Sequence, residues 1–182
     1  MGKSALLKCM VSSSSCAAND ADAGIYSEAL TSPTIGVDLV SVTLPRRFSA
    51  GGHAAVVSLR EVGSSMKARW QSYLPASDAI LFVIDASDTA NMATSLVFLY
   101  EVLLARASSV KSKPLAVCVN KSDLCDEEAF EALGNVFRFD DIVHSEDAGA
   151  ITVLGGQCQN RINCLDASAA SAVIAWLSAQ PF

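Results

Sequence analysis

The 182-residue sequence predicts an α/β domain built on a mainly parallel sheet. Two continuous apolar runs, one ending in Asp85 and one ending before Asn120, are typical of parallel strands that are buried on both faces. Between them, residues 91–107 carry apolar side chains at helical spacing, so strand and helix alternate. Ligands of such sheets bind at the carboxyl ends of the strands, and the polar motifs of this sequence follow those ends.

The remaining elements are predicted from periodicity and turn residues. Residues 3–11 are expected to form a short helix with one apolar face, followed by a polar loop. Two strand-like segments, 39–44 and 54–59, flank a glycine-containing turn and are expected to pair in antiparallel orientation. Helices are expected over 127–136 and 168–179, and the last strand is either 151–154 or 161–164.

The composition is that of one globular domain over residues 1–182, with 51% hydrophobic and 18% charged residues. The formal net charge of -6 weighs against a broad nucleic-acid surface. No secretory signal and no apolar run long enough to span a membrane is visible. The six cysteines lack C-x-x-C spacing, so they are interpreted as reduced residues of the core.

Gly2, Lys3 and Ser4, followed by an apolar segment, match the end of the phosphate-binding pattern G-x-x-x-x-G-K-[ST]. A helix N-terminus offers free N–H groups and a positive dipole end, which suit phosphate. In this interpretation Lys3 reaches the β- and γ-phosphates and Ser4 places its hydroxyl on Mg²⁺. Two alternatives stay open: the charged start of an amphipathic helix, and N-myristoylation of Gly2, which Leu6 at the sixth position disfavours. We interpret the missing first half of the pattern as a shortened start.

The segment Asn120-Lys121-Ser122-Asp123 follows a predicted buried strand and resembles the N-K-x-D element of the small GTPases. In that family the aspartate accepts hydrogen bonds from guanine N1–H and the exocyclic amine, which adenine cannot match. The resemblance implies that Asp123 selects guanine, that Asn120 ties neighbouring loops together and that Lys121 covers the base. It also aligns residues 163–165 with the S-A-[KR] element, so that Cys164 N–H would meet the guanine oxygen. The alternative is a polar strand-to-helix turn.

Further motifs follow one another in the order found in one branch of the small GTPases. Pro-Thr-Ile-Gly at 33–36 resembles the first switch loop, and Arg-Glu-Val-Gly at 60–63 stands where Arf-like proteins have W-D-x-G-G-Q. With Trp70 and Tyr73, the chain resembles the Arf-like small GTPases over nearly its whole length. Its arginine–glutamate pair and long insertion before the first switch are similar to the divergent branch of Arf-like protein sixteen. The resemblance implies a three-layer P-loop small-GTPase fold with a mainly parallel sheet and one antiparallel strand pair, the first strand being absent.

The same resemblance implies roles for the remaining site residues. Thr34 would ligate Mg²⁺ together with Ser4, and the Glu61 carboxylate would contact the ion through water. Ser64 stands where a glycine N–H meets the γ-phosphate, and Ser65 occupies the position of the water-positioning glutamine. Because serine cannot span the distance that glutamine does, hydrolysis is expected to be slow or absent without a partner.

The sequence therefore predicts a guanine-nucleotide switch that uses GTP, GDP and Mg²⁺ and recruits effectors and regulators through its switch loops. As an enzyme it would be a GTPase with Ser65 at the catalytic position. The alternative is a pseudo-GTPase, an interaction module without productive nucleotide binding. The resemblance implies a cytoplasmic monomer in membrane, ciliary or flagellar trafficking. It also implies no nucleic-acid partner and, at most, peripheral membrane association.

Other candidate residues are weaker. His53 and His144 show no ligand spacing and are interpreted as surface residues. The acid pairs 140–141 and 146–147 could mimic a metal cluster, but acids in loops are usually just solvated. Trp70 and Trp176 fit helix faces and are expected to pack in the core rather than to form a stacking platform.

Overall fold

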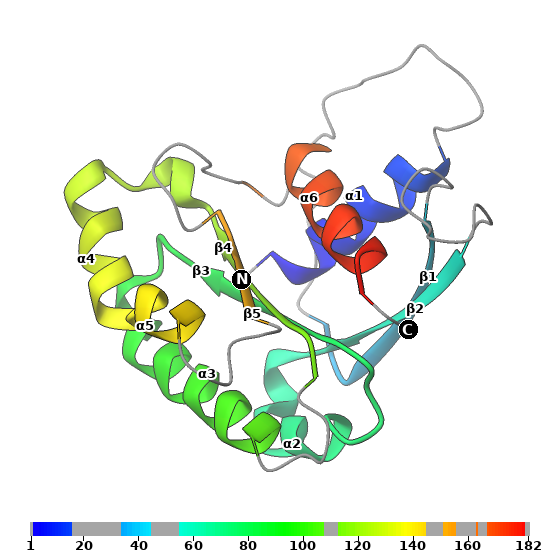
Figure 1. Cartoon of the computed structure of the whole chain (residues 1–182), viewed down its shortest axis with the longest axis horizontal. Helices are drawn as coiled ribbons and strands as arrows, with labels where there is room; N and C mark the ends of the chain where they lie inside the picture. Colours follow the sequence, from blue (N-terminus) through cyan, green and yellow to red (C-terminus); the bar gives the residue numbers. More distant parts are fainter. Residues whose placement is uncertain are drawn as a thin grey trace. The chain divides into compact units, whose positions relative to one another are not determined.

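The computed structural model describes residues 2–15, 34–44, 55–107, 113–144, 151–155, 163 and 167–180 (Figure 1). The contacts between residues divide the chain into two compact units. The first unit comprises Arg69–Asn163, and the second joins Gly2–Ala68 to Cys164–Phe182. A single domain over residues 1–182 stays a prediction.

The first unit is built on a parallel sheet in the order β3-β4-β5. Its strands are β3 (Ile80–Asp85), β4 (Leu115–Asn120) and β5 (Ile151–Leu154). Every residue of the central strand β4 is buried, which explains its continuous apolar sequence. Asp85 and Asn120 are register partners, so the two polar strand ends meet at one edge of the sheet.

Helices α3 (Met92–Ala107), α4 (Glu127–Phe137) and α5 (Phe139–His144) lie on the same side of this sheet (Figure 1). Helix α4 begins where the Asp126 carboxylate accepts a hydrogen bond from Ala129 N at 2.7 Å, and it ends at Arg138 in the left-handed region. The short helices of this unit are α2 (Trp70–Tyr73), η4 (Thr89–Asn91) and η5 (Ser122–Leu124). The core joins buried side chains of all these layers: Phe82, Ile84, Leu99, Val117, Val119, Phe130, Leu133, Phe137, Ile142 and Ile151.

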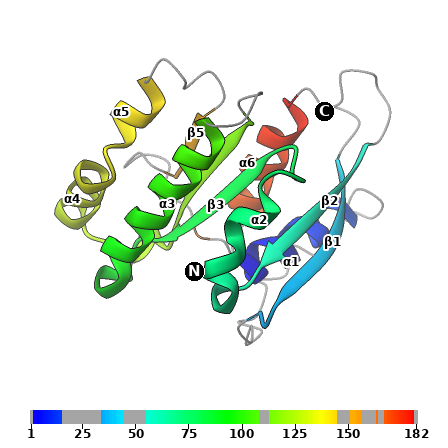
Figure 2. The ribbon, with the colours of Figure 1, turned by 90° about the horizontal axis from the view of Figure 1, so that it is seen from below.

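The second unit contains the antiparallel pair β1 (Val37–Leu44) and β2 (Ala55–Val62), shown in Figure 2. Val42 and Leu44 are buried while Ser41 and Thr43 are exposed, as expected for a strand with one solvated face. Helix α1 (Lys3–Ser15) contacts both β1 and α6 (Ala167–Ser178) and buries Leu6 and Met10 almost completely. Segment η3 (Ser64–Arg69) follows β2.

The predicted fold class is confirmed, with a parallel sheet and one antiparallel pair, and β5 corresponds to the first of the two candidates for the last strand. The hairpin is longer than predicted because the ladder continues to Val37 and Val62, and Gly63 N then donates to Gly36 O at 2.8 Å. Helix α1 continues four residues beyond the predicted end at Val11, through a serine run that periodicity alone does not assign to a helix.

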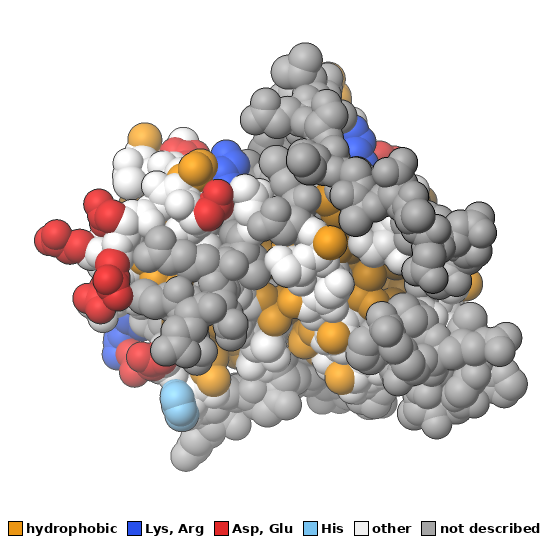
Figure 3. All heavy atoms as spheres, turned by 90° about the horizontal axis from the view of Figure 1, so that it is seen from above, with side chains coloured by type: hydrophobic (Ala, Val, Ile, Leu, Met, Phe, Trp, Pro, Cys, Tyr) orange, Lys and Arg blue, Asp and Glu red, His pale blue; other side chains and the backbone are white. Residues whose placement is uncertain are grey.

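Helix α5 was not predicted. It begins only one residue after the end of α4, and its six residues are too few to show a helical period of their own. The prediction that residues 140–141 lie in a loop is therefore wrong. Their side chains are exposed in α5, and acidic side chains gather over α4 and α5 (Figure 3). Within the described segments no group of three or more His, Cys, Asp and Glu residues could hold a metal ion. His53 and residues 146–147 lie outside the described residues, and His144 is exposed.

The structure also bears on the core and membrane predictions. Cys9 and Cys118 are buried, and Trp176 is buried in α6, as predicted for core residues. Trp70 packs against Phe82 and Phe98 with ring centroids 6.2 and 5.2 Å away. Of the helices in the described part of the chain, none combines the length and the apolar character needed to cross a membrane.

Candidate nucleotide and metal site

The predicted site residues fall into two groups, one in each unit. The metal group consists of Ser4, Thr34 and Glu61 in the second unit, and the base group consists of Asn120, Lys121 and Asp123 in the first unit. Each group lies where an element begins or ends. In parallel sheets and helices these are the positions at which ligands are bound.

The metal group brings three oxygen atoms together from three distant parts of the chain. Ser4 lies in the first turn of α1, Thr34 precedes β1, and Glu61 is the second-last residue of β2. Ser4 Oγ donates to Glu61 Oε1 at 2.8 Å, and Thr34 Oγ1 donates to the same oxygen at 3.0 Å. The two hydroxyl oxygens are 3.0 Å apart. Hydroxyl and carboxylate oxygens are hard donors of the kind that Mg²⁺ prefers.

Gly63 keeps the loop that carries Thr34 against the end of β2. A Cβ atom at Gly63 would lie 2.1 Å from the backbone oxygen of Thr34, which is far inside van der Waals contact. The backbone N–H of Gly63 also donates to Gly36 O at 2.8 Å. Gly63 therefore shapes the metal group, a role that the sequence analysis did not assign. The sequence feature that could have indicated this role is the position of Gly63, two residues after Glu61.

Gly2 and Lys3 lie at the beginning of α1, next to Ser4. Gly2 has φ 81°, and its carbonyl accepts a hydrogen bond from Leu6 N at 3.0 Å. Burial lowers the pKa of the Lys3 ammonium, as does the neighbouring charge of Lys67, while the Glu61 carboxylate opposes the shift. A cation beside a helix N-terminus is suited to an anionic group such as phosphate.

Ser64 and Ser65 are exposed at the start of η3, directly after Gly63. Neither hydroxyl side chain has the length of glutamine, so the position of Ser65 supplies no amide to orient an attacking water. Cys164, predicted to offer a backbone N–H to guanine, lies outside the described residues.

The base group occupies the carboxyl end of β4 and the turn that follows. Asn120 is 2% exposed, and its carbonyl accepts from Ala86 N at 2.9 Å, which ties this turn to the end of β3. Lys121 adopts the left-handed conformation with φ 58°, and Asp123 is exposed in η5. Asn163 Nδ2 donates to Asp123 Oδ2 at 3.2 Å and leaves the other carboxylate oxygen for a further donor.

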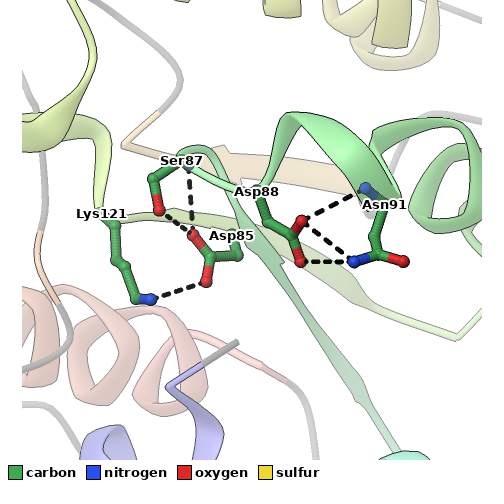
Figure 4. A network of polar contacts seen from close by, with 5 residues as sticks. All are labelled: Asp85, Ser87, Asp88, Asn91 and Lys121. Atoms are coloured by element: carbon green, nitrogen blue, oxygen red, sulfur yellow. Dashed lines mark hydrogen bonds and ion pairs between the residues drawn. The ribbon is translucent and has the colours of Figure 1, made fainter.

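Asp85 fixes the Lys121 side chain, as Figure 4 shows. Lys121 Nζ lies 2.8 Å from Asp85 Oδ2, and Ser87 Oγ donates to Asp85 Oδ1 at 2.7 Å. Burial raises the pKa of the Asp85 carboxyl, but hydrogen bonds from Lys121 and Ser87 and the charge of Lys121 outweigh it and hold this pKa below its ordinary value. Next to this network, the Asp88 carboxylate accepts hydrogen bonds from Asn91.

Sequence reasoning gave Asp85 no role in the site. The available signal was the position of Asp85. It ends one buried strand, and Lys121 follows the neighbouring buried strand. Register pairing of Asp85 with Asn120 then brings the acid next to the lysine.

Comparisons with known proteins agree with this arrangement. Residues 26–163 match the model of the ADP-ribosylation factor family. The chain is 28% identical over 149 residues to human ADP-ribosylation factor-like protein 16, covering 82% of this chain and 66% of that protein. It is 29% identical over 157 residues to ADP-ribosylation factor-like protein 8d of Arabidopsis thaliana, covering 85% and 77%. It is also 29% identical over 93 residues to human ADP-ribosylation factor-like protein 4D, covering 50% and 44%.

Proposed function

Since this chain belongs to the ADP-ribosylation factor family, we propose that it is a guanine-nucleotide-dependent switch that binds GTP and GDP with Mg²⁺. The observation that carries this proposal is the base group. A buried parallel strand ends in a left-handed turn at Lys121, and the turn presents the exposed carboxylate of Asp123. A carboxylate accepts two hydrogen bonds at once, which matches the adjacent N1–H and amine donors of guanine.

The metal group supports the phosphate half of the proposal. Ser4 and Thr34 would hold Mg²⁺ with Glu61 beside them, and Gly2 and Lys3 would bind phosphate at the start of α1. When bound, Mg²⁺ neutralises charge on the β- and γ-phosphate oxygens. Because Thr34 lies on the loop before β1, its hydroxyl would link that loop to the γ-phosphate and make the loop sensitive to GTP.

The finer parts of the proposal rest on family membership. We propose that effectors and regulators bind through the loops around residues 33–36 and 60–65. We also propose that the protein acts from the cytoplasm in membrane or ciliary trafficking. The exposed apolar residues Ile35 and Leu39, which are 93% and 65% exposed, support a protein-binding surface at the first of these loops.

The base group predicts that Asp123→Asn weakens GTP and GDP binding about tenfold, since one guanine donor then faces an amide N–H₂. The variant should gain affinity for xanthosine triphosphate, whose carbonyl replaces the guanine amine and accepts from that amide. Competition among GTP, GDP, ATP and xanthosine triphosphate on the 182-residue chain measures both effects. Equal affinity of the unaltered protein for ATP and GTP would contradict the proposal. Asp126→Asn, on the exposed acid that caps α4, is the matched control.

A second candidate function, the pseudo-GTPase, is favoured by Ser64 and Ser65. We predict that GTP loaded on this chain is hydrolysed no faster than about 10⁻⁴ s⁻¹ without a partner, because no glutamine orients the attacking water. Single-turnover hydrolysis measures the rate, and a rate of about 1 s⁻¹ would show a catalytic group not identified among the described residues. No detectable loading of GTP or GDP would favour the pseudo-GTPase.

A further inference from the structure

Helix α3 exposes an apolar stripe to solvent. Val97 and Leu104 are 57% and 71% exposed, and Tyr100 between them is 38% exposed. Their spacing of three and four residues places them on consecutive turns of one helix face, and Ala93 extends the stripe by one more turn. A surface helix normally exposes polar residues, so a continuous apolar stripe of this kind indicates a binding surface.

The packing of α3 places this stripe on the side of the helix nearer to α4 and α5. Leu99 lies on the inner face of α3, and Phe98, on one flank, packs against Trp70 of α2 with ring centroids 5.2 Å apart. Leu103 lies on the opposite flank and packs against the core to which α4 and α5 contribute. Tyr100 is one turn from Leu103, so the stripe continues from that flank. Figure 2 shows α3 between α2 on one side and α4 and α5 on the other.

The helices beside the stripe are strongly acidic. Their exposed acids are Glu127, Glu128 and Glu131 in α4 and Asp140 and Asp141 in α5. Arg138 is the only lysine or arginine in residues 127–144, and it is already paired with Asp141. Glu101 adds a further acid on α3 itself, one turn after Val97. The outer faces of α3, α4 and α5, here called the α3–α5 surface, therefore combine an apolar stripe with a negative potential.

We infer that the α3–α5 surface binds an amphipathic helix of a partner protein. The apolar face of that helix would cover the stripe, and its Lys and Arg residues would meet the acids of α4 and α5. Spacings of three and four residues are those by which one helix packs along another. The surface shares no residue with the metal group, the base group or the loops around residues 33–36 and 60–65, so this binding goes beyond the proposed function.

Charge favours a basic partner over the other occupants of an apolar surface. A second copy of this chain would bring the same acids against those of the first, and like charges placed together at an interface weaken binding. The net charge of -6 adds to this repulsion. An anionic membrane surface would be repelled by the same acids. A basic amphipathic helix gains from both features, because its apolar face is buried while its charges are attracted.

A synthetic helical peptide tests the inference. A peptide of about 16 residues spans about 24 Å, the length of α3, and carries leucines on one face with lysines on both flanks. Its fluorescence anisotropy measures binding to the 182-residue chain. We expect Val97→Asp combined with Leu104→Asp to weaken binding at least about tenfold, because two apolar contacts are lost. The same change adds two negative charges, so adsorption by charge alone would become stronger. Equal or tighter binding by this variant would overturn the inference.

Val56→Asp is the matched control, because Val56 is 67% exposed in β2 of the other unit and should not contact the peptide. The acids are tested by a second peptide with glutamate in place of lysine, which should bind the unaltered chain at least about tenfold more weakly. Equal binding of the two peptides would contradict the role of the acids. Thermal melting followed by circular dichroism shows that each variant is folded. If the aspartates lower the melting temperature, serines at Val97 and Leu104 replace them, with the same expected loss of binding.

Two further measurements test the other occupants. Sedimentation velocity should show that the substitutions at Val97 and Leu104 leave the oligomeric state of the chain unchanged. Vesicles of phosphatidylserine should not retain the chain through these residues. Loss of self-association, or of vesicle binding, in the substituted chain would assign the stripe to a second copy or to a membrane and overturn the inference. Peptide binding is measured without added nucleotide, so a failure of GTP loading would refute the proposed function and leave this test intact.

Discussion

Gly63→Ala is expected to weaken Mg²⁺-dependent GTP binding by about 10- to 100-fold. The added methyl carbon would lie 2.1 Å from Thr34 O and 3.1 Å from Gly36 O, both of which are backbone atoms that cannot rotate away. Relief of the clash requires the Thr34 loop to move by more than about 1 Å, which separates its hydroxyl from Ser4 and Glu61. GDP binding should fall much less, because the Thr34 loop is proposed to respond to the γ-phosphate. Isothermal titration with each nucleotide measures the difference.

Gly134→Ala is the matched control for this substitution. Gly134 lies inside α4, and a Cβ atom there would meet no heavy atom within 4 Å. Alanine in a helix interior is more stable than glycine by about 0.5–1 kcal/mol, so this variant should melt at a higher temperature with unchanged nucleotide affinity. Retention of GTP affinity within about threefold by Gly63→Ala would contradict the role given to the glycine.

Each helix or strand could be predicted only as far as its sequence shows a clear pattern of apolar residues. The carboxyl ends of β3 and β4 were predicted nearly to the residue, because strands buried on both faces are continuous apolar runs bounded by polar residues. Helix α5 was not predicted, since a six-residue helix is too short to show a periodic pattern. The length of the hairpin was also underestimated, because its outer residues carry no burial pattern that extends the strand.

For the site, short motifs predicted the residues but not the contacts between them. The hydrogen-bonded contacts of Glu61 with both hydroxyls depend on side-chain length and on the bend at Gly63, which no one-dimensional pattern encodes. The pair between Asp85 and Lys121 depends on strand register, which relates residues far apart in the sequence. Both are long-range properties of the folded chain, so local sequence patterns do not reveal them.

The Asp85–Lys121 pair also makes a prediction about stability. The Asp85 side chain is 9% exposed and that of Lys121 is 37% exposed, so the pair is partly shielded from solvent. Asp85→Asn leaves the lysine without its carboxylate and removes the charged acceptor of Ser87. We expect the free energy of unfolding to fall by about 2 kcal/mol at pH 7, less than for a fully buried pair because solvent screens Lys121.

The pH dependence of that loss follows from the direction of the pKa shift. The pKa of Asp85 is lower in the folded protein than in the unfolded chain, where it is about 3.9. The stabilisation is therefore present above the unfolded value and is lost as pH falls through the lower, folded value. The difference in unfolding free energy between the unaltered protein and Asp85→Asn should be constant at neutral pH, narrow below about pH 4, and nearly vanish in stronger acid.

Urea unfolding in a Trp176→Phe background measures this difference, because Trp70 then reports on the unit that contains the pair through its contacts with Phe82 and Phe98. Asp141→Asn is the matched control: its ion pair with Arg138 is short, at 2.5 Å, but the two side chains are 61% and 67% exposed. Such a pair contributes about 0–1 kcal/mol, so its removal should change little at any pH. A stability difference for Asp85→Asn that grows as the solution is acidified would show that the carboxyl is protonated more readily in the folded state, and that Lys121 does not stabilise its charge.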